Sequence, residues 1–94
     1  MKIWVDDIRP APEGYIWCKS VNVAIALIEH SCQIDVIDID HDAGEYANDG
    51  GDYIKLLDWL EVTGRCYHIH IHSMNPVGVE NMRRMIRFNS WQEI

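Results

Sequence analysis

The sequence predicts a small three-layer α/β fold with a four-stranded, mainly parallel sheet and about three helices. Two observations predict it. Short runs of β-branched and aromatic residues alternate with stretches whose apolar residues recur at helical spacing. Polar residues also gather where the predicted strands end, as expected at the working edge of a parallel sheet. The predicted order is β-β-α-β-α-β-α, with no fifth strand.

The first half of the chain is predicted to hold two strands and one helix. Residues 2–6 (KIWVD) form a strand, and a loop rich in proline and glycine follows it. Residues 15–19 (YIWCK) form the second strand. Ser20 is a suitable N-cap for the helix. The apolar stripe of this helix consists of Val21, Ala24, Ile25 and Ile28.

The second half is predicted to alternate strands with helices. Residues 34–40 (IDVIDID) form the third strand, and a loop of acids and glycines follows it. Residues 53–63 form a helix with leucines on one face. Residues 67–73 (YHIHIHS) form the fourth strand. The pair Asn75-Pro76 then predicts the start of a last helix, with an N-cap followed by proline in the first turn.

Composition indicates one soluble domain, residues 1–94, and limits its partners. Hydrophobic residues make up 48% and charged residues 24%, and the net charge is −7. Such a negative field argues against binding to duplex DNA. No apolar run is long enough for a membrane helix or signal peptide. The widely spaced Cys18, Cys32 and Cys66 favour a reduced, cytoplasmic protein without disulfides or a cysteine zinc site.

Four carboxylates follow two of the predicted strands. Asp6 and Asp7 end the first strand, and Asp40 and Asp42 follow the third. If these strands are neighbours, the acids meet at one edge and repel one another unless a cation lies between them. Oxygen ligands suit Mg²⁺, and Mn²⁺ would also accept the imidazole of His41. The alternative is that the acids only solvate turns.

Histidines alternate along the fourth strand. His68, His70 and His72 share one face of this strand. Asp38 lies inside the third strand, on the same face as Val36 and Asp40. If the two strands are neighbours, Asp38 is expected to bond His70. The histidines could be half-buried packing residues, but His72 lies nearest the strand end and is the best functional candidate. A zinc site made by His70 and His72 is a second option.

An anion site is predicted at the start of the last helix. Ser73 and Asn75 surround this start, where free backbone N–H groups and the helix dipole favour phosphate. Arg9 follows the first pair of acids and could make a two-pronged contact with a phosphoryl oxygen. It could equally form a surface ion pair with Glu13.

Four segments together resemble a known family. DDIRP, DIDHDAG, GGDY and HIHSMNPVGVENM are similar to the cyclic-phosphate processing receiver-like domains, a divergent branch of the flavodoxin-like receiver fold of response regulators. The resemblance implies that Asp6 and Asp7 bind metal, that Asp40 matches the acceptor aspartate and that Ser73 contacts the phosphoryl group. Two receiver features are missing from the sequence: a fifth strand with its lysine, and a helix after the first strand.

These departures favour a hydrolase over a phosphorelay protein. The resemblance implies a metal-dependent phosphoesterase acting on a 2′,3′-cyclic nucleotide or on the cyclic phosphate of an RNA end. Asp40, His72 and His41 would then be catalytic. The two histidines could move protons, since imidazole titrates near working pH. Two alternatives remain: a module that binds a ligand or is phosphorylated on Asp40, and a protein that sequesters a nucleotide. Self-association through a sheet edge or helix face is also compatible with the sequence.

Overall fold

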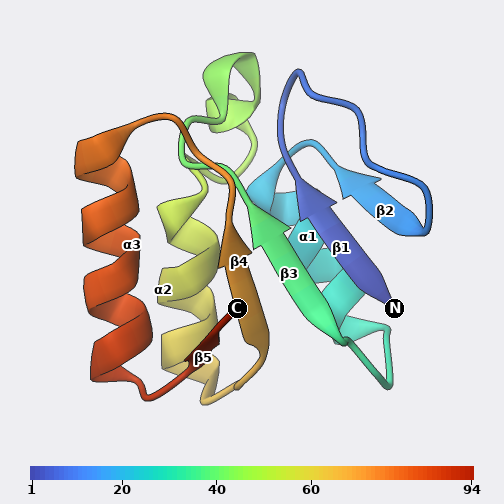
Figure 1. Ribbon diagram of the computed structural model, residues 1–94. Coiled ribbons are helices and arrows are strands. Elements are labelled where there is room, and N and C mark those ends of the chain that lie inside the picture. Colours follow the sequence, from blue (N-terminus) through green and yellow to red (C-terminus); the bar gives the residue numbers. More distant parts are fainter.

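The computed structural model describes residues 1–94 and contains one parallel sheet packed against three helices (Figure 1). The strands are β1 (Lys2–Val5), β2 (Tyr15–Cys18), β3 (Val36–Ile39), β4 (His68–Ile71) and β5 (Gln92–Glu93). The helices are α1 (Val21–Glu29), α2 (Ile54–Thr63) and α3 (Pro76–Phe88), and a 3₁₀ helix, η1, spans Gly44–Asn48. None of the helices combines the length and apolar character needed to cross a bilayer.

The sheet has the strand order β2-β1-β3-β4-β5, and every pair is parallel. The chain places β2 on one side of β1 and then crosses to add β3, β4 and β5 on its other side. The strand order therefore reverses between β1 and β3. In open α/β sheets a ligand site lies at the carboxyl ends of the strands beside such a switch point. The predicted α/β architecture with a parallel sheet is therefore confirmed.

The prediction that the fifth strand is missing was wrong. The chain leaves α3 through Ser90, which has a positive φ of 57°, and Trp91 is buried before Gln92 pairs with His68. β5 has only two residues, both exposed. A strand of two exposed residues has no alternating apolar pattern, so no sequence pattern predicts it.

The predicted three layers are also wrong, because all three helices lie on one face of the sheet (Figure 1). Residues 6–14, which join β1 to β2, contain no helix. Apolar side chains of alternate strand residues point toward the helices and are fully buried: Ile3, Val5, Ile37, Ile39 and Ile69. The opposite face carries Trp4, Trp17, His68 and His70, which are exposed or half-buried. The fold is therefore a two-layer one.

The helices start and stop at the residues their chemistry favours. The hydroxyl of Ser20 accepts a hydrogen bond from the Val23 N–H at 3.1 Å, and Asn75 Oδ1 accepts one from the Gly78 N–H at 3.1 Å. Gly64 ends α2 in the left-handed conformation, φ 69°. The buried faces of the three helices consist of Val21, Ala24 and Ile28, then Leu56, Leu57 and Leu60, then Met82 and Ile86.

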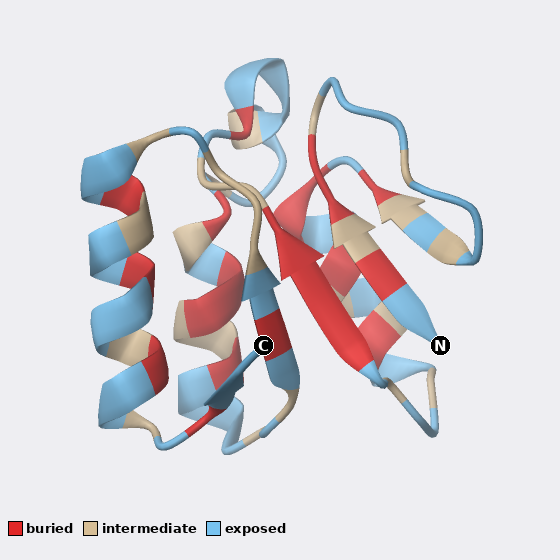
Figure 2. Ribbon diagram, in the orientation of Figure 1, coloured by how far each residue is buried: buried red, intermediate tan, exposed pale blue.

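The central strand β3 is buried along its whole length, including Asp38, which is only 7% exposed (Figure 2). It lies between β1 and β4, with the helices behind it. A buried carboxylate is costly unless a hydrogen-bond donor or a cation satisfies it. The partner of Asp38 belongs to the candidate site.

Candidate functional site

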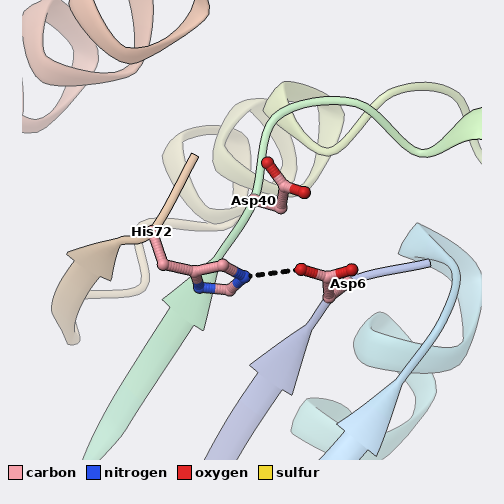
Figure 3. Close-up of side chains that lie close together, drawn as sticks. All are labelled: Asp6, Asp40 and His72. Carbon is pink, nitrogen blue, oxygen red and sulfur yellow. Dashed lines mark hydrogen bonds and ion pairs between the residues drawn. The ribbon is translucent and has the colours of Figure 1, made fainter. Parts of the chain in front are cut away.

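Three strand ends bring Asp6, Asp40 and His72 together (Figure 3). Asp6 follows β1, Asp40 follows β3 and His72 follows β4. One ligand atom from each of them lies within 4.8 Å of the others, which is a spacing that a metal ion could bridge. The sequence placed all three at this edge because parallel strands end on the same side of a sheet.

Asp6 is 1% exposed and is held by three donors. Its Oδ1 accepts hydrogen bonds from the backbone N–H groups of Ile8 and Arg9, at 2.9 and 2.8 Å. Its Oδ2 lies 2.9 Å from Nε2 of His72. Burial alone would raise the pKa of Asp6, but these hydrogen bonds outweigh it and hold the pKa below its usual value. Asp6 is therefore ionised.

His72 is clamped between two carboxylates. Its Nδ1 lies 2.6 Å from Asp38 Oδ1, and its Nε2 faces Asp6. Burial would lower the pKa of His72, yet the hydrogen bonds to Asp38 and Asp6 raise it. The ring therefore favours its doubly protonated, charged form.

The predicted bond between Asp38 and His70 was wrong. The two residues are paired in the sheet register, as neighbouring strands require. However, the ring of His70 bonds the carbonyl of Ile94 at 2.7 Å, and His72 takes Asp38 instead. His72 lies just past the end of β4, where its side chain is free to fold back over the neighbouring strand.

Trp4 is a site residue that sequence reasoning missed. Its ring stacks on His72 with 3.8 Å between centroids and 4° between planes. Its Nε1 donates to the carbonyl of Arg9 at 2.9 Å, and Nε1 of Trp17 donates to the carbonyl of Asp6 at 2.7 Å. Two indoles thus hold the short β1–β2 loop. Only their position on the helix-free face could have signalled this role.

Asp7 lies close enough to Asp6 and Asp40 to feel their charges. Partial burial and the negative charges of Asp6 and Asp40 raise the pKa of the Asp7 carboxyl. Gly44 packs directly on this carboxylate, and a Cβ at Gly44 would overlap Asp7 Oδ2. Gly44 also has a positive φ of 55°, so glycine is favoured there for two reasons.

A cleft of about 280 Å³ opens beside the acids. We call it the Arg9 cleft; its lining residues are Arg9, Asp40, Asp42, Ser73, Met74 and Asn75. The guanidinium of Arg9 donates to the His72 carbonyl at 3.2 Å. This hydrogen bond holds Arg9 beside the group formed by Asp6, Asp40 and His72. Ser73 Oγ accepts from the Asn75 N–H at 3.1 Å. All three residues predicted to bind substrate therefore border one opening.

His41 and Asp42 form a separate pair at the rim. Nδ1 of His41 lies 2.8 Å from Asp42 Oδ1, and the His41 ring packs against Gly78 in the first turn of α3. The amide of Asn75 reaches Asp42 Oδ2 at 3.4 Å. His41 does not line the Arg9 cleft. In this structure Asp42 contacts His41 and Asn75 rather than the group formed by Asp6, Asp40 and His72.

The possible metal ligands at this edge are carboxylate oxygens of Asp6 and Asp40 and a ring nitrogen of His72. The negative charges of Asp6 and Asp40 act on Asp7, and a cation beside them would relieve this repulsion. His72 has both ring nitrogens bonded to carboxylates, and His70 is bonded to Ile94. The histidine pair of the zinc hypothesis is therefore already engaged.

A family model described as "Cyclic-phosphate processing Receiver domain" matches residues 1–88 of the chain. No curated protein and no solved structure matches the chain.

Proposed function

The chain belongs to the cyclic-phosphate processing receiver domain family, and from this membership we propose that it is a metal-dependent phosphoesterase that opens a cyclic phosphate. The substrate would be a 2′,3′-cyclic nucleotide or the 3′ end of an RNA. The observation that carries the proposal is the convergence of Asp6, Asp40 and His72 beside a cleft bordered by Arg9 and Ser73.

The Arg9 cleft supplies the phosphate contacts. Arg9 presents a guanidinium that is half exposed and can pair with phosphoryl oxygens. The start of α3 adds the positive end of the helix dipole, although Pro76 has no N–H and the N–H groups of Gly78 and Val79 donate to Asn75. Ser73 can donate its hydroxyl proton to a phosphoryl oxygen, because its Oγ only accepts in the structure.

Asp6, Asp7 and Asp40 would hold a divalent cation, Mg²⁺ or Mn²⁺, with Asp42 within reach of the same cleft. Such a cation polarises the phosphodiester and lowers the pKa of water. Asp40 is well placed for this role because it belongs to the cluster with Asp6 and His72 and also lines the Arg9 cleft. Its Oδ1 accepts from the His41 N–H at 2.7 Å, which fixes the direction of the carboxylate.

His72 would handle the proton. The raised pKa of His72 favours protons on both ring nitrogens. Nδ1 faces the buried Asp38, so Nε2–H, which faces Asp6 at the sheet edge, is the proton that His72 would transfer. Water attacks phosphorus, one bond from phosphorus to a ribose oxygen breaks, and that oxygen takes the Nε2 proton. The proton lost by water returns to His72 through solvent. The net change is the addition of one water molecule. His41 would orient the carboxylate of Asp42, which its ring contacts.

A non-catalytic receiver module is the second candidate. The family description names a receiver domain, and Asp40 borders an open cleft, where a phosphoryl donor could reach it. Such a module would bind a phosphorylated ligand or carry a phosphoryl group without turning over a cyclic phosphate.

Phosphorus NMR separates the two candidates. The protein is mixed with 2′,3′-cyclic nucleotides and Mg²⁺ or Mn²⁺, and the cyclic phosphate signal is followed with time. We expect conversion to a phosphomonoester, and the product's position, 2′ or 3′, identifies the bond that breaks. Asp40→Asn is expected to lower the rate at least about 100-fold, as expected for the loss of a group that stabilises the transition state.

Val62→Ala is the matched control, because Val62 is 85% exposed near the far end of α2. This variant should react at the rate of the natural sequence. Ring opening that proceeds equally in Asp40→Asn would refute the role of Asp40. No ring opening at all, with folded protein and bound metal, would favour the receiver module.

A further inference from the structure

A second cleft lies beside Asp7 and shares no lining residue with the Arg9 cleft. It encloses about 430 Å³, and its lining residues are Asp7, Ile8, Gly44, Glu45 and Tyr46. We call it the Tyr46 cleft. This volume falls within the range of small-molecule sites, roughly 300–1,000 Å³. Asp7, which follows Asp6 in the chain, lines this cleft and so places it next to the carboxylates at the end of β1.

The walls of the Tyr46 cleft combine two exposed apolar side chains, Ile8 and Tyr46, with the carboxylates of Asp7 and Glu45. Ile8 is 77% exposed and Tyr46 is 38% exposed, although each could have packed against the core. A phosphate group gains nothing from such walls, because its oxygens need N–H, O–H or cationic partners. An aliphatic side chain and an aromatic ring facing one opening suit a flat, partly apolar group.

We propose that the Tyr46 cleft binds the nucleobase of a nucleotide whose phosphate lies beside Asp6 and Asp40. This inference rests on the proposed function and names its substrate class: a nucleotide or an RNA end, not a base-free cyclic phosphate. Tyr46 provides the stacking surface, and Ile8 covers the base from the β1–β2 loop. The carboxylate of Glu45 accepts a hydrogen bond from a base N–H, which each of the four RNA bases carries.

The backbone around Tyr46 is already held in place. The N–H of Tyr46 donates to the carbonyl of Ala43 at 3.0 Å, and its own carbonyl accepts from the Asp49 N–H at 2.9 Å. Gly44, two residues earlier, packs on the Asp7 carboxylate. One short 3₁₀ helix thus fixes Tyr46 relative to Asp7, so the base and the phosphate would be positioned by the same segment.

A binding experiment tests this without requiring turnover. In the presence of Mg²⁺, the affinities for adenosine 3′-monophosphate and for inorganic phosphate are measured by calorimetry on the whole protein. We expect the nucleotide to bind more tightly than phosphate. Tyr46→Ala should weaken nucleotide binding about 5- to 100-fold, the range that stacking of a base on an aromatic ring supplies. Phosphate binding should not change.

Tyr46→Phe keeps the ring and should keep the affinity, and Val62→Ala is the surface control. Equal affinity for the nucleotide and phosphate would overturn the inference. So would a Tyr46→Ala variant that binds the nucleotide unchanged, or that loses both ligands equally.

The two proposals fail in different ways. If the protein binds adenosine 3′-monophosphate through Tyr46 but opens no cyclic phosphate, the phosphoesterase function is wrong and the nucleobase site stands. If it opens base-free glycerol 1,2-cyclic phosphate as fast as a cyclic nucleotide, and Tyr46→Ala changes neither rate, the function stands. The nucleobase site would then be wrong.

Discussion

His72 connects the buried interior of the sheet to its open edge. Asp38, inside β3, bonds one ring nitrogen, and Asp6, at the end of β1, faces the other. Trp4 covers one side of the ring. The buried carboxylate of Asp38 is therefore satisfied by a charged donor, which makes its burial tolerable. The same contact fixes which nitrogen can exchange a proton at the edge.

Asp38→Asn should shift the pH dependence of catalysis. The asparagine oxygen can still accept from Nδ1–H, but the variant lacks the negative charge that helps to raise the pKa of His72. A general acid works only while protonated, so kcat/KM falls as pH rises through its pKa. We expect this falling limb to move to lower pH in Asp38→Asn. NMR titration of His72 provides the independent check, and an unmoved limb would contradict the role of His72.

Stability should also depend on the charge of His72. Because its pKa in the folded protein is raised above the usual 6.5, its stabilising contribution is present below that value. This contribution is lost as pH rises through the raised pKa. Urea unfolding over this range should show the free energy of unfolding falling with pH. The fall should be smaller in His72→Gln and unchanged in His30→Gln, which alters an exposed residue after α1.

At the scale of elements, the first turn of α3 holds His41 through a close contact at Gly78. Alanine at a helix interior is normally more stable than glycine by about 1 kcal/mol. At this position, however, its Cβ would overlap the His41 ring. We expect Gly78→Ala to lower the free energy of unfolding by about 1–3 kcal/mol, as overpacking does.

Chemical denaturation measures this effect, and Val79→Ala serves as the matched neighbour because Val79 is only partly buried in the same turn. A stabilised Gly78→Ala variant would show that His41 moves away freely. In that case the packing of His41 on α3 would not hold Asp42 in position.

The sequence predicted the long elements well because each has a local signal. Ser20, Gly64 and Asn75 mark helix ends by capping chemistry, and the observed helix bounds agree with the prediction to within a residue or two. The short elements carry no such signal. β5 has two residues, and η1 lies in a loop of acids and glycines where no apolar period exists.

The site was predictable where topology alone decides it. Asp6, Asp40 and His72 converge because parallel strands end on one side. The partner of Asp38 depends on a side chain turning back past the end of β4, which strand alternation does not describe. Trp4 and Trp17 matter because no helix covers their face of the sheet, and the three-layer prediction hid this.

At the scale of the whole molecule, the protein carries a net charge of −7, and the carboxylates of Asp6 and Asp40 lie close together at one edge of the sheet. Removing one carboxylate there should relieve repulsion while no metal is bound. We expect Asp40→Asn to raise the free energy of unfolding by about 0.5–2 kcal/mol without metal, a common trade-off at functional sites. Asparagine keeps an oxygen for the His41 N–H, so the local backbone contact survives.

Mg²⁺ should reverse this order. A cation that binds only the folded protein raises its melting temperature, and the rise grows with the logarithm of the cation concentration above the Kd. Differential scanning calorimetry should show a rise in Tm with Mg²⁺ for the natural sequence and little or none for Asp40→Asn. Equal shifts in both proteins would place the cation elsewhere.

If the carboxylates at the ends of β1 and β3 hold a catalytic cation, cyclic-phosphate hydrolysis must depend on a divalent metal. The most direct test is the initial rate of opening of a 2′,3′-cyclic nucleotide, followed by phosphorus NMR as Mg²⁺ is titrated into metal-free protein. We expect a rate that starts near the uncatalysed value and rises to saturation, and no rise in Asp40→Asn. A rate that is the same in chelator as in saturating Mg²⁺ or Mn²⁺ would contradict it.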